Sequence, residues 1–228
     1  MAEAATLSDT PEIRERWGNF AWTDASATKA KDIIARYPAG RQASAVMPLL
    51  FLAQRQVGDE VGTYGWLPIP VMEFIARELN MPYIRVLEVA SFYTMYNLAP
   101  VGKYLVQVCG TTPCMLRGAE DLMTACRKRG MHVGRPSEDG LWTLMEVECL
   151  GACANAPMVQ INDDNYEDLT PELLGTVLDA LARGETPPTL SQIGRKASAP
   201  EGGPTTLTVM QNENHNYRGE WGVKEEAK

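Results

Sequence analysis

The spacing of apolar residues changes near residue 100, and the part before that point has a helical pattern. From about residue 27 to 97, apolar residues recur at intervals of three and four, which places them on one face of a helix. Proline and glycine interrupt the pattern where helices are expected to start and stop. The predicted helices cover residues 28–38, 43–58, 70–80 and 82–97, with a glycine-rich turn over 58–68.

From residue 103 the pattern alternates between strand-like and helix-like segments. Strands are expected at 104–108, 131–134, 141–148 and 157–162, and helices at 113–129 and 170–183. This order is α/β with a hairpin near its end. It suits a small thioredoxin-like sheet with helices packed on its faces, and it suits other α/β sandwiches equally well. The predicted fold class is therefore α+β, with a helical bundle followed by an α/β domain.

The last part of the chain, after Gly184, is rich in Pro, Gly, Ser and Thr and then becomes polar. Such a segment cannot bury enough apolar surface to order itself alone. It is expected to be disordered or to lie along a partner, and Tyr217 and Trp221 favour docking. The predicted organisation is an N-terminal extension at 1–26, a helical domain at 27–100, an α/β domain at 101–186 and an extended tail at 187–228.

Composition narrows the class of partner. The formal charge of −8 and the pI near 4.9 oppose binding to nucleic acid and to anionic lipid surfaces, since both attract basic patches. The longest strongly apolar stretch, residues 46–53, is far shorter than the roughly 20 residues of a membrane span, so no direct membrane insertion is expected. The N-terminus lacks the layout of a secretory signal, and five cysteines favour a reducing compartment with metal or redox use. We expect a bacterial cytoplasmic location, or a mature form that has lost a targeting segment.

Four of the cysteines form two pairs, Cys109-x4-Cys114 and Cys149-x3-Cys153, and each pair follows a strand-like apolar run. Strands that end side by side bring their following loops together, so both pairs can converge on one site. A 2Fe-2S cluster takes two thiolates per iron, which this spacing fits. Thr112 is expected to cap the next helix, so that the helix N-terminus favours the thiolate form of Cys114. A four-thiolate zinc site and plain buried or reactive thiols remain alternatives on spacing alone.

The fifth cysteine, Cys126, is expected to be a core residue. It continues an apolar stripe of helical spacing through Met115, Ala119 and Leu122. Twelve residues of helix would also place it roughly 18 Å from Cys114. His132 lies outside the ligand spacing and is interpreted as a structural or surface residue.

Several common catalytic motifs are missing from the sequence. It contains no G-x-G-x-x-G after a strand, no phosphate-binding G-x4-G-K-[S/T] loop and no C-x-x-C pair. Dinucleotide binding, nucleotide hydrolysis and dithiol exchange therefore lack their usual residues. The chain alone does not have the features of a complete enzyme.

Three segments resemble one known family, the 24 kDa subunit of respiratory complex I, the proton-pumping NADH-quinone oxidoreductase. They are VLEVASFYTMYN at 86–97, VCGTTPCMLRGAEDL at 108–122 and VECLGACANAPMVQINDDNYEDLT at 147–170. The likeness spans about residues 27–200, and all four cysteine positions are occupied. Gly110 departs from the Thr or Ser expected there, which would alter hydrogen bonding near the ligands. The segment QIGRKASAPEGGPTTL also resembles the family and is expected to run over a neighbouring subunit.

The resemblance implies a helical domain joined to a thioredoxin-like ferredoxin domain, with Cys109, Cys114, Cys149 and Cys153 as ligands of one 2Fe-2S cluster. It further implies a larger flavoprotein partner that binds NADH and FMN, with the cluster beside the flavin and off the main electron path. Other iron-sulfur subunits complete the expected assembly. The expected location is peripheral, on the cytoplasmic side of the bacterial inner membrane.

Three alternative functions remain open at this point. The closest is the equivalent diaphorase subunit of a soluble NAD-linked hydrogenase or formate dehydrogenase, which differs in its partners. The second is a free ferredoxin-like carrier, and the third is a zinc-stabilised interaction module without redox chemistry. Iron and acid-labile sulfide content separates the zinc module from the others.

Overall fold

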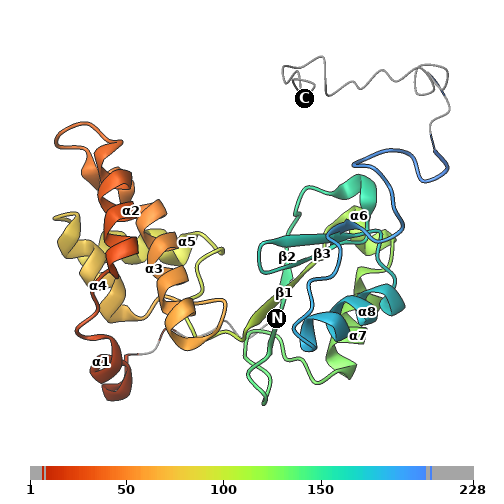
Figure 1. The fold of residues 1–228 in the computed structure, drawn as a ribbon, viewed down its shortest axis with the longest axis horizontal. Helices are drawn as coiled ribbons and strands as arrows, with labels where there is room; N and C mark the ends of the chain where they lie inside the picture. Colours follow the sequence, from red (N-terminus) through yellow and green to blue (C-terminus); the bar gives the residue numbers. More distant parts are fainter. Residues whose placement is uncertain (1–6, 8, 204–205, 207–228) are drawn as a thin grey trace, which may run out of the picture.

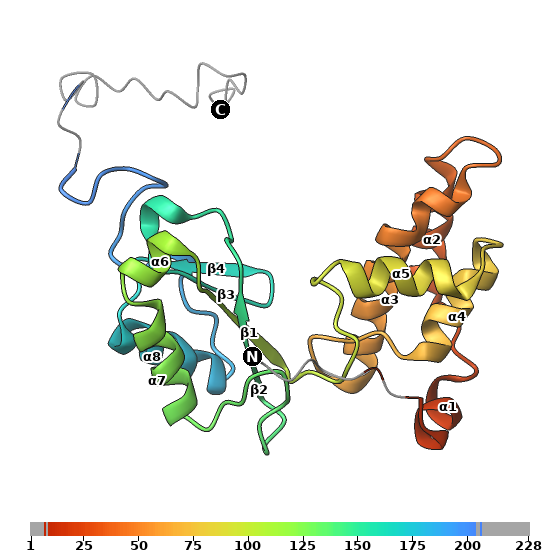
Figure 2. The same cartoon turned by 180° about the vertical axis from the view of Figure 1, so that it is seen from behind.

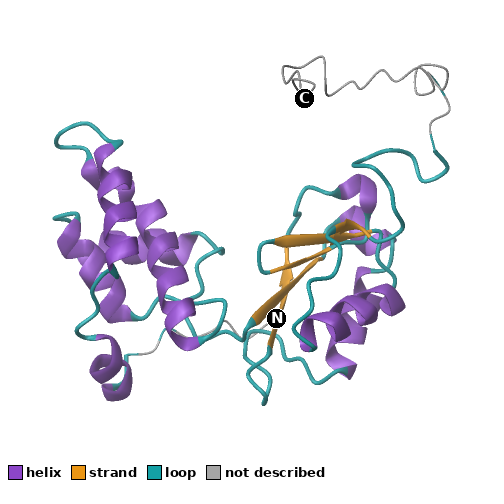
Figure 3. Cartoon of the chain, in the orientation of Figure 1, coloured by secondary structure: helices purple, strands orange, loops and turns teal. Residues whose placement is uncertain are grey.

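The computed structural model describes residue 7, residues 9–203 and residue 206. One end of the molecule consists of helices alone, and the described strands lie at the other end together with further helices (Figures 1 and 3). The helical part contains α1 Pro11–Trp17, α2 Asp24–Ala35, α3 Val46–Val61, α4 Ile69–Glu78 and α5 Tyr83–Phe92, with a 3-10 turn at Gln42–Ala45.

Local signals explain where these helices begin and end. The hydroxyl of Thr23 accepts a hydrogen bond from Ser26 N and caps α2, and α3 ends at Gly62, which has a φ of +72°. All four predicted helices exist with shifted ends. The predicted turn over 58–68 is too long, because α3 continues to Val61. The sequence interpretation also missed α1, which the Thr10 cap starts.

The helices share a core of their own. Leu49, Val57 and Ile75 are fully buried in it. Trp17 and Phe20, from the segment interpreted as an N-terminal extension, are buried in the same core. Part of that segment is therefore packed against the helices.

The second part is built on a mixed five-stranded sheet in the order β2-β1-β3-β4-β5. β1 pairs in parallel with β2 and antiparallel with β3, and β3 forms an antiparallel hairpin with β4, a strand that the sequence interpretation missed. The register of β1 and β2 runs from Tyr104 opposite Trp142 to Cys109 opposite Val147. Both strands therefore end at the same edge. The strands are β1 Tyr104–Cys109, β2 Trp142–Val147, β3 Val159–Ile161, β4 Asp164–Glu167 and β5 Leu190–Ser191.

Three helices accompany the sheet: α6 Thr112–Leu116, α7 Ala119–Lys128 and α8 Pro171–Ala182. α7 packs against β1 and lies alongside α8 (Figure 2). The single helix predicted over 113–129 is wrong, because Gly118, with a φ of +103°, breaks it into α6 and α7. The strand predicted at 131–134 forms only isolated bridges.

The predicted tail at 187–228 begins with ordered structure. β5 pairs in parallel with β4, and the residues that follow contact the second part of the molecule instead of extending away from it. Tyr217, Trp221 and His215 lie outside the described residues. Within the described ranges, no helix combines the length and the apolar character needed to cross a bilayer.

The two parts of the molecule touch through a few polar contacts. Arg55 and Tyr64 of the helical part bind Asp163, at the turn between β3 and β4. Tyr64 N also donates to the Gly102 carbonyl, at the start of the second part. The guanidinium of Arg55 lies 4.2 Å from the centre of the Tyr64 ring. These contacts fix the hairpin against the helices.

Candidate metal centre

The first thiol pair lies where a strand ends and a helix begins. Cys109 is the last residue of β1 and Cys114 lies in α6, and each is only 1% exposed. The predicted cap at Thr112 is wrong by one residue, since Thr111 is the N-cap. Its hydroxyl makes no cap hydrogen bond and lies 3.4 Å from Cys109 Sγ.

The two thiols of this pair have opposite pKa shifts. Burial acts to raise the pKa of Cys109, but hydrogen bonds from Thr111, from the Leu150 backbone and from Cys114 lower it below its ordinary value. Burial, with the hydrogen bond to Cys109, raises the pKa of Cys114 to about 11. The expectation that the helix N-terminus keeps Cys114 ionised is therefore wrong for the metal-free thiol. In this pair the Cys114 thiol donates a hydrogen bond to the Cys109 sulfur.

The second thiol pair lies in an exposed loop after β2. Cys149 and Cys153 are both exposed, and their sulfurs are 3.4 Å apart. Gly151 lies between them with a φ of +89°, which L residues with side chains rarely adopt. Its N–H, with the Cys153 thiol, lowers the pKa of Cys149, while the hydrogen bond to Cys149 raises the pKa of Cys153.

The two pairs lie close enough to affect each other. The charge of Cys109 raises the pKa of both Cys149 and Cys153, and the Thr111 hydroxyl, which lies beside Cys109 Sγ, lowers the pKa of Cys149. α6 contacts the 3-10 turn Cys153–Asn155, which carries the second pair. In the described part of the chain, no three His, Cys, Asp or Glu residues form a group placed to hold a single metal ion. The donor set is two pairs of thiols that follow neighbouring parallel strands, and two thiolates per iron is the requirement of a 2Fe-2S cluster.

The other singled-out residues have simpler roles. Cys126 is fully buried in the core of the second part, as predicted. Ala119 and Leu122 are buried beside it, but Met115 is 57% exposed, so the predicted stripe does not include it. Met115 lies outside the stripe because the helix break at Gly118 gives α6 a different direction from α7. His132 lies in an isolated bridge opposite Arg135.

Sequence reasoning missed four residues near the thiols: Thr111, Asn155, Asp168 and Arg195. The position of Thr111, between the paired cysteines, was the available signal for its role. Asn155, Asp168 and Arg195 come together through contacts distant in sequence, described below. No local motif marks them.

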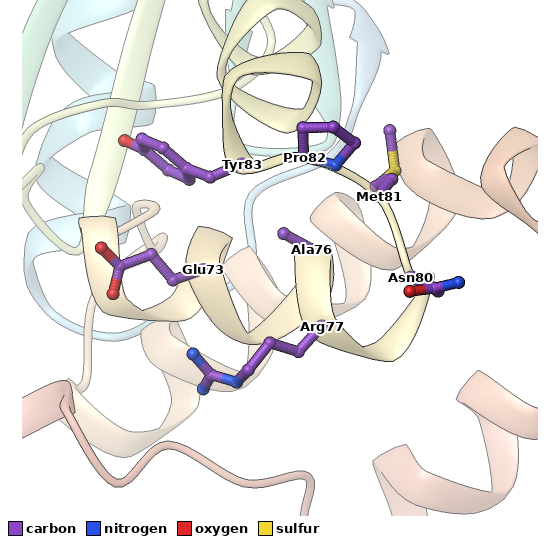
Figure 4. Close-up of a pocket in the computed structure, with 7 residues that line it drawn as sticks. All are labelled: Glu73, Ala76, Arg77, Asn80, Met81, Pro82 and Tyr83. Atoms are coloured by element: carbon purple, nitrogen blue, oxygen red, sulfur yellow. The ribbon is translucent and has the colours of Figure 1, made fainter.

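A cleft of about 590 Å³ lies elsewhere, at the turn between α4 and α5. Figure 4 shows the side chains of Glu73, Arg77 and Tyr83 around it. The Glu73 carboxylate also accepts hydrogen bonds from Arg14 at 3.0 Å. None of the four paired thiols lines this cleft, so it is separate from the candidate metal centre.

Comparisons with known proteins agree with this geometry. The thioredoxin-like 2Fe-2S ferredoxin family matches residues 30–182. A subunit of NADH-quinone oxidoreductase from Rickettsia conorii (strain ATCC VR-613 / Malish 7) is 53% identical over 164 residues, which are 72% of this chain and 95% of that protein. Its counterpart from Rickettsia bellii (strain RML369-C) is 52% identical over 164 residues, with the same coverage of 72% and 95%.

A solved structure shares the fold at low identity. A crystal structure of an NAD+-reducing NiFe hydrogenase in the air-oxidized state matches 61% of this chain and 23% of that chain, with a TM-score of 0.50 and 15% identity. At this identity the likeness shows the fold alone. The family match confirms the thioredoxin-like part of the predicted fold.

Proposed function

Because the chain belongs to the thioredoxin-like 2Fe-2S ferredoxin family, we propose that Cys109, Cys114, Cys149 and Cys153 hold one 2Fe-2S cluster, with one pair to each iron. The observation that carries this proposal is the parallel register of β1 and β2, which brings both pairs to one sheet edge. When bound, such a cluster supplies reversible one-electron transfer. Zinc fits this arrangement less well, because a single zinc ion needs four thiolates around one point.

The residues of the chain prepare the site in different ways. All four thiols must be ionised to bind iron; the lowered pKa values of Cys109 and Cys149 favour this, and the raised pKa values of Cys114 and Cys153 oppose it. The Thr111 hydroxyl lies beside Cys109 Sγ and can donate to a ligand sulfur. Hydrogen bonds to ligand sulfurs are one of the factors that set a cluster's reduction potential.

The chain then serves as an electron-transfer subunit of NADH-quinone oxidoreductase, complex I. Support comes from the relatives in that enzyme, which the chain matches over 95% of their length. In this assignment a larger flavoprotein partner holds FMN and binds NADH, and the chain accepts one electron from the flavin off the main path. Its neighbours include other iron-sulfur subunits, and it lies peripherally on the cytoplasmic side of the bacterial inner membrane.

The domain division is also a proposal. A helical bundle domain, predicted at 27–100, is followed by the ferredoxin domain, predicted at 101–186, but both reach beyond those limits: Trp17 and Phe20 lie in the core of the bundle, and β5 extends the sheet. The two separate clusters of buried side chains support the boundary near residue 100. The bundle contains no cysteine, so all four proposed ligands lie in the second domain.

An affinity pull-down of the tagged full-length chain from its source cells tests the assignment. Co-purification of a flavoprotein with membrane-embedded quinone-reductase subunits, and NADH oxidation by the eluate, is the expected result. Hydrogenase or formate dehydrogenase subunits beside the flavoprotein would assign the chain to a soluble diaphorase instead. Isolation without partners would favour a free carrier. Iron and acid-labile sulfide assays on the same eluate test the cluster, and zinc without iron would contradict it.

A further inference from the structure

Residues 190–201, which we name the C-terminal strap, are hydrogen-bonded to the loop that carries the second thiol pair. The strap begins as β5, with Leu190 opposite Tyr166 and Ser191 opposite Glu167 of β4. Gln192 N also donates to the Glu167 carbonyl at 3.0 Å. The strap is thereby fixed to the sheet edge next to β4.

Arg195 of the strap binds the loop and the sheet together. Its Nε donates to Asp168 Oδ2 at 3.0 Å, and its Nη2 forms an ion pair with the same carboxylate. The same Nη2 donates to the carbonyl of Ala154 at 2.7 Å, and Nη1 donates to the carbonyl of Ala199 at 2.9 Å. Ala154 directly follows Cys153, so this side chain bonds to the backbone next to a proposed ligand.

The Arg195 contact is well enclosed. The Asp168 and Arg195 side chains are only 6% and 12% exposed. Asp168 is held by two further contacts, since Ser191 Oγ donates to its carboxylate at 2.7 Å and its own N–H donates to the Asn155 carbonyl at 2.8 Å. An enclosed ion pair whose hydrogen bonds are completed fixes the relative position of the groups it joins.

Asn155 provides a second connection between the loop and the strap. This side chain is 3% exposed, and its Nδ2 donates to Glu167 Oε2 and to the Ala197 carbonyl, both at 2.8 Å. Asn155 lies in the same 3-10 turn as Cys153. Two neighbouring residues of the turn, Ala154 and Asn155, are therefore bonded to the strap.

The strap also reaches the first thiol pair. Glu201 forms an ion pair with Arg117 at 3.9 Å, directly after α6, which carries Cys114. Both side chains are more than 60% exposed, so this contact adds little to stability. It does place the strap across both halves of the site.

We propose that Arg195 is a positioning residue for the iron-sulfur site, acting with Asp168 and Asn155 to hold the second thiol pair in place. This inference rests on the proposed cluster ligands and adds the C-terminal strap to the site. The loop that carries the second pair is exposed and contains a glycine with positive φ. Few buried contacts within the loop therefore offset the conformational entropy that it loses when it is ordered. Bonds from the strap to the turn offset that cost.

Cluster retention in the full-length chain tests this role. Wild type and Arg195→Ala are loaded anaerobically with iron and sulfide, and iron release to a chelator is followed by absorbance. Loss of an outer partner of a metal ligand typically costs about 10- to 100-fold in affinity, so we expect release to be faster by at least the lower figure. The matched control is Arg183→Ala, which removes an arginine from an exposed ion pair with Glu185 and should release iron at the wild-type rate.

Spectroscopy separates positioning from general stability. Moving the turn changes the backbone around the ligand sulfurs, so Arg195→Ala should shift the EPR g values and the midpoint potential of the reduced cluster, and Arg183→Ala should not. Wild-type g values, potential and release rate in Arg195→Ala would overturn the inference.

Two further variants decide the matter if Arg195→Ala does not fold. Arg195→Lys keeps a positive charge beside Asp168 but lacks the planar fork that also reaches the Ala154 carbonyl. The second variant is Asp168→Asn, which removes the carboxylate charge beside Arg195. We expect Arg195→Lys to fold, and to release iron faster than wild type but more slowly than Asp168→Asn. Wild-type release in both variants would overturn the strap's role, whereas a wild-type chain that holds no iron or sulfide would overturn the proposed cluster itself.

Discussion

The two thiol pairs offer the same donor atoms, but one pair is buried and the other is exposed. Cys109 and Cys114 are buried. Cys109 is the last residue of β1, which lies between β2 and β3, and Cys114 lies in the following helix, α6. Cys149 and Cys153 are exposed, in a loop that is hydrogen-bonded through the Ala154 carbonyl and the Asn155 side chain to residues far along the chain. In each pair one thiol has a lowered pKa and the other a raised one. The first pair is thus placed inside the core by the sheet and the helix that follows, and the second is held at the surface by contacts with the end of the described chain.

Removing one thiol should give the largest effect. Cys149→Ser replaces a proposed ligand with a hydroxyl that is a poorer donor to iron, so we expect the cluster signal to be lost or strongly changed. EPR of the reduced protein measures this. Cys126→Ser is the control, since Cys126 is buried in the core, and its spectrum should match wild type. Loss of the signal in the control would contradict the assignment of Cys126 to the core.

Substitution of Gly151, which has a positive φ, tests whether the second loop depends on its backbone conformation. Gly151 has a φ of +89°, and a side chain there meets no neighbouring atom, so the cost of Gly151→Ala comes from the backbone alone. That cost is roughly 1–2 kcal/mol. We expect the loop to shift, with faster iron release and a modest fall in the free energy of unfolding measured in urea. Unchanged release would mean that the exposed pair tolerates a rearranged loop.

Acid should weaken the contact between Asp168 and Arg195. Burial acts to raise the pKa of Asp168, but its hydrogen bonds from Arg195 and Ser191 outweigh this and lower the pKa below its ordinary value. The stability that Asp168 contributes is therefore complete above its unfolded pKa of about 3.9, and it is lost as the pH falls through the lower folded value.

The measurement compares the free energy of unfolding of cluster-free wild type and Asp168→Asn from pH 7 downward. The difference between them should stay constant to about pH 5 and then narrow in more acidic solution. A constant difference throughout the acid range would mean that the ion pair with Arg195 does not hold Asp168 ionised in solution.

The smallest effect is expected at Gly110, in the first loop. Its backbone is outside the left-handed region, and an added Cβ would meet Glu146 Oε1 at 2.9 Å, the far end of an exposed and flexible side chain. Gly110→Ser should therefore change the unfolding free energy by no more than about 0.5 kcal/mol, the usual range for surface changes. The midpoint potential of the cluster should be measured in parallel, because the added hydroxyl brings a new donor near Cys109. A fall in stability as large as that of Gly151→Ala would contradict the contrast between the loops.

The predictable part of the site is the part with local causes. The apolar run before Cys109 and the Pro113 signal gave the strand and the helix start, and the cap was missed by one residue because Thr111 and Thr112 are chemically alike. The break at Gly118 was missed because the apolar spacing continues across it, while its left-handed backbone appears only in the structure.

The unpredicted part depends on residues far apart in sequence. Asp168 and Arg195 are separated by a helix, and nothing local to either residue marks them as partners. The prediction of an extended tail was based on composition. Composition does not show that Leu190 and Ser191 pair with β4 at the edge of the sheet. Likewise the buried positions of Trp17 and Phe20 required the helical core to be known first. Pairing between distant segments is therefore where sequence reasoning was least informative.

The position of the strap in the chain also sets an order of assembly. All four thiols and the sheet strands β1 to β4 are synthesised before Ser191, Arg195 and Ala197. The contacts around Ala154 and Asn155 therefore form only after nearly the whole ordered chain has been made. A product of early termination at residue 189 would carry every proposed ligand and lack the residues that secure half of them.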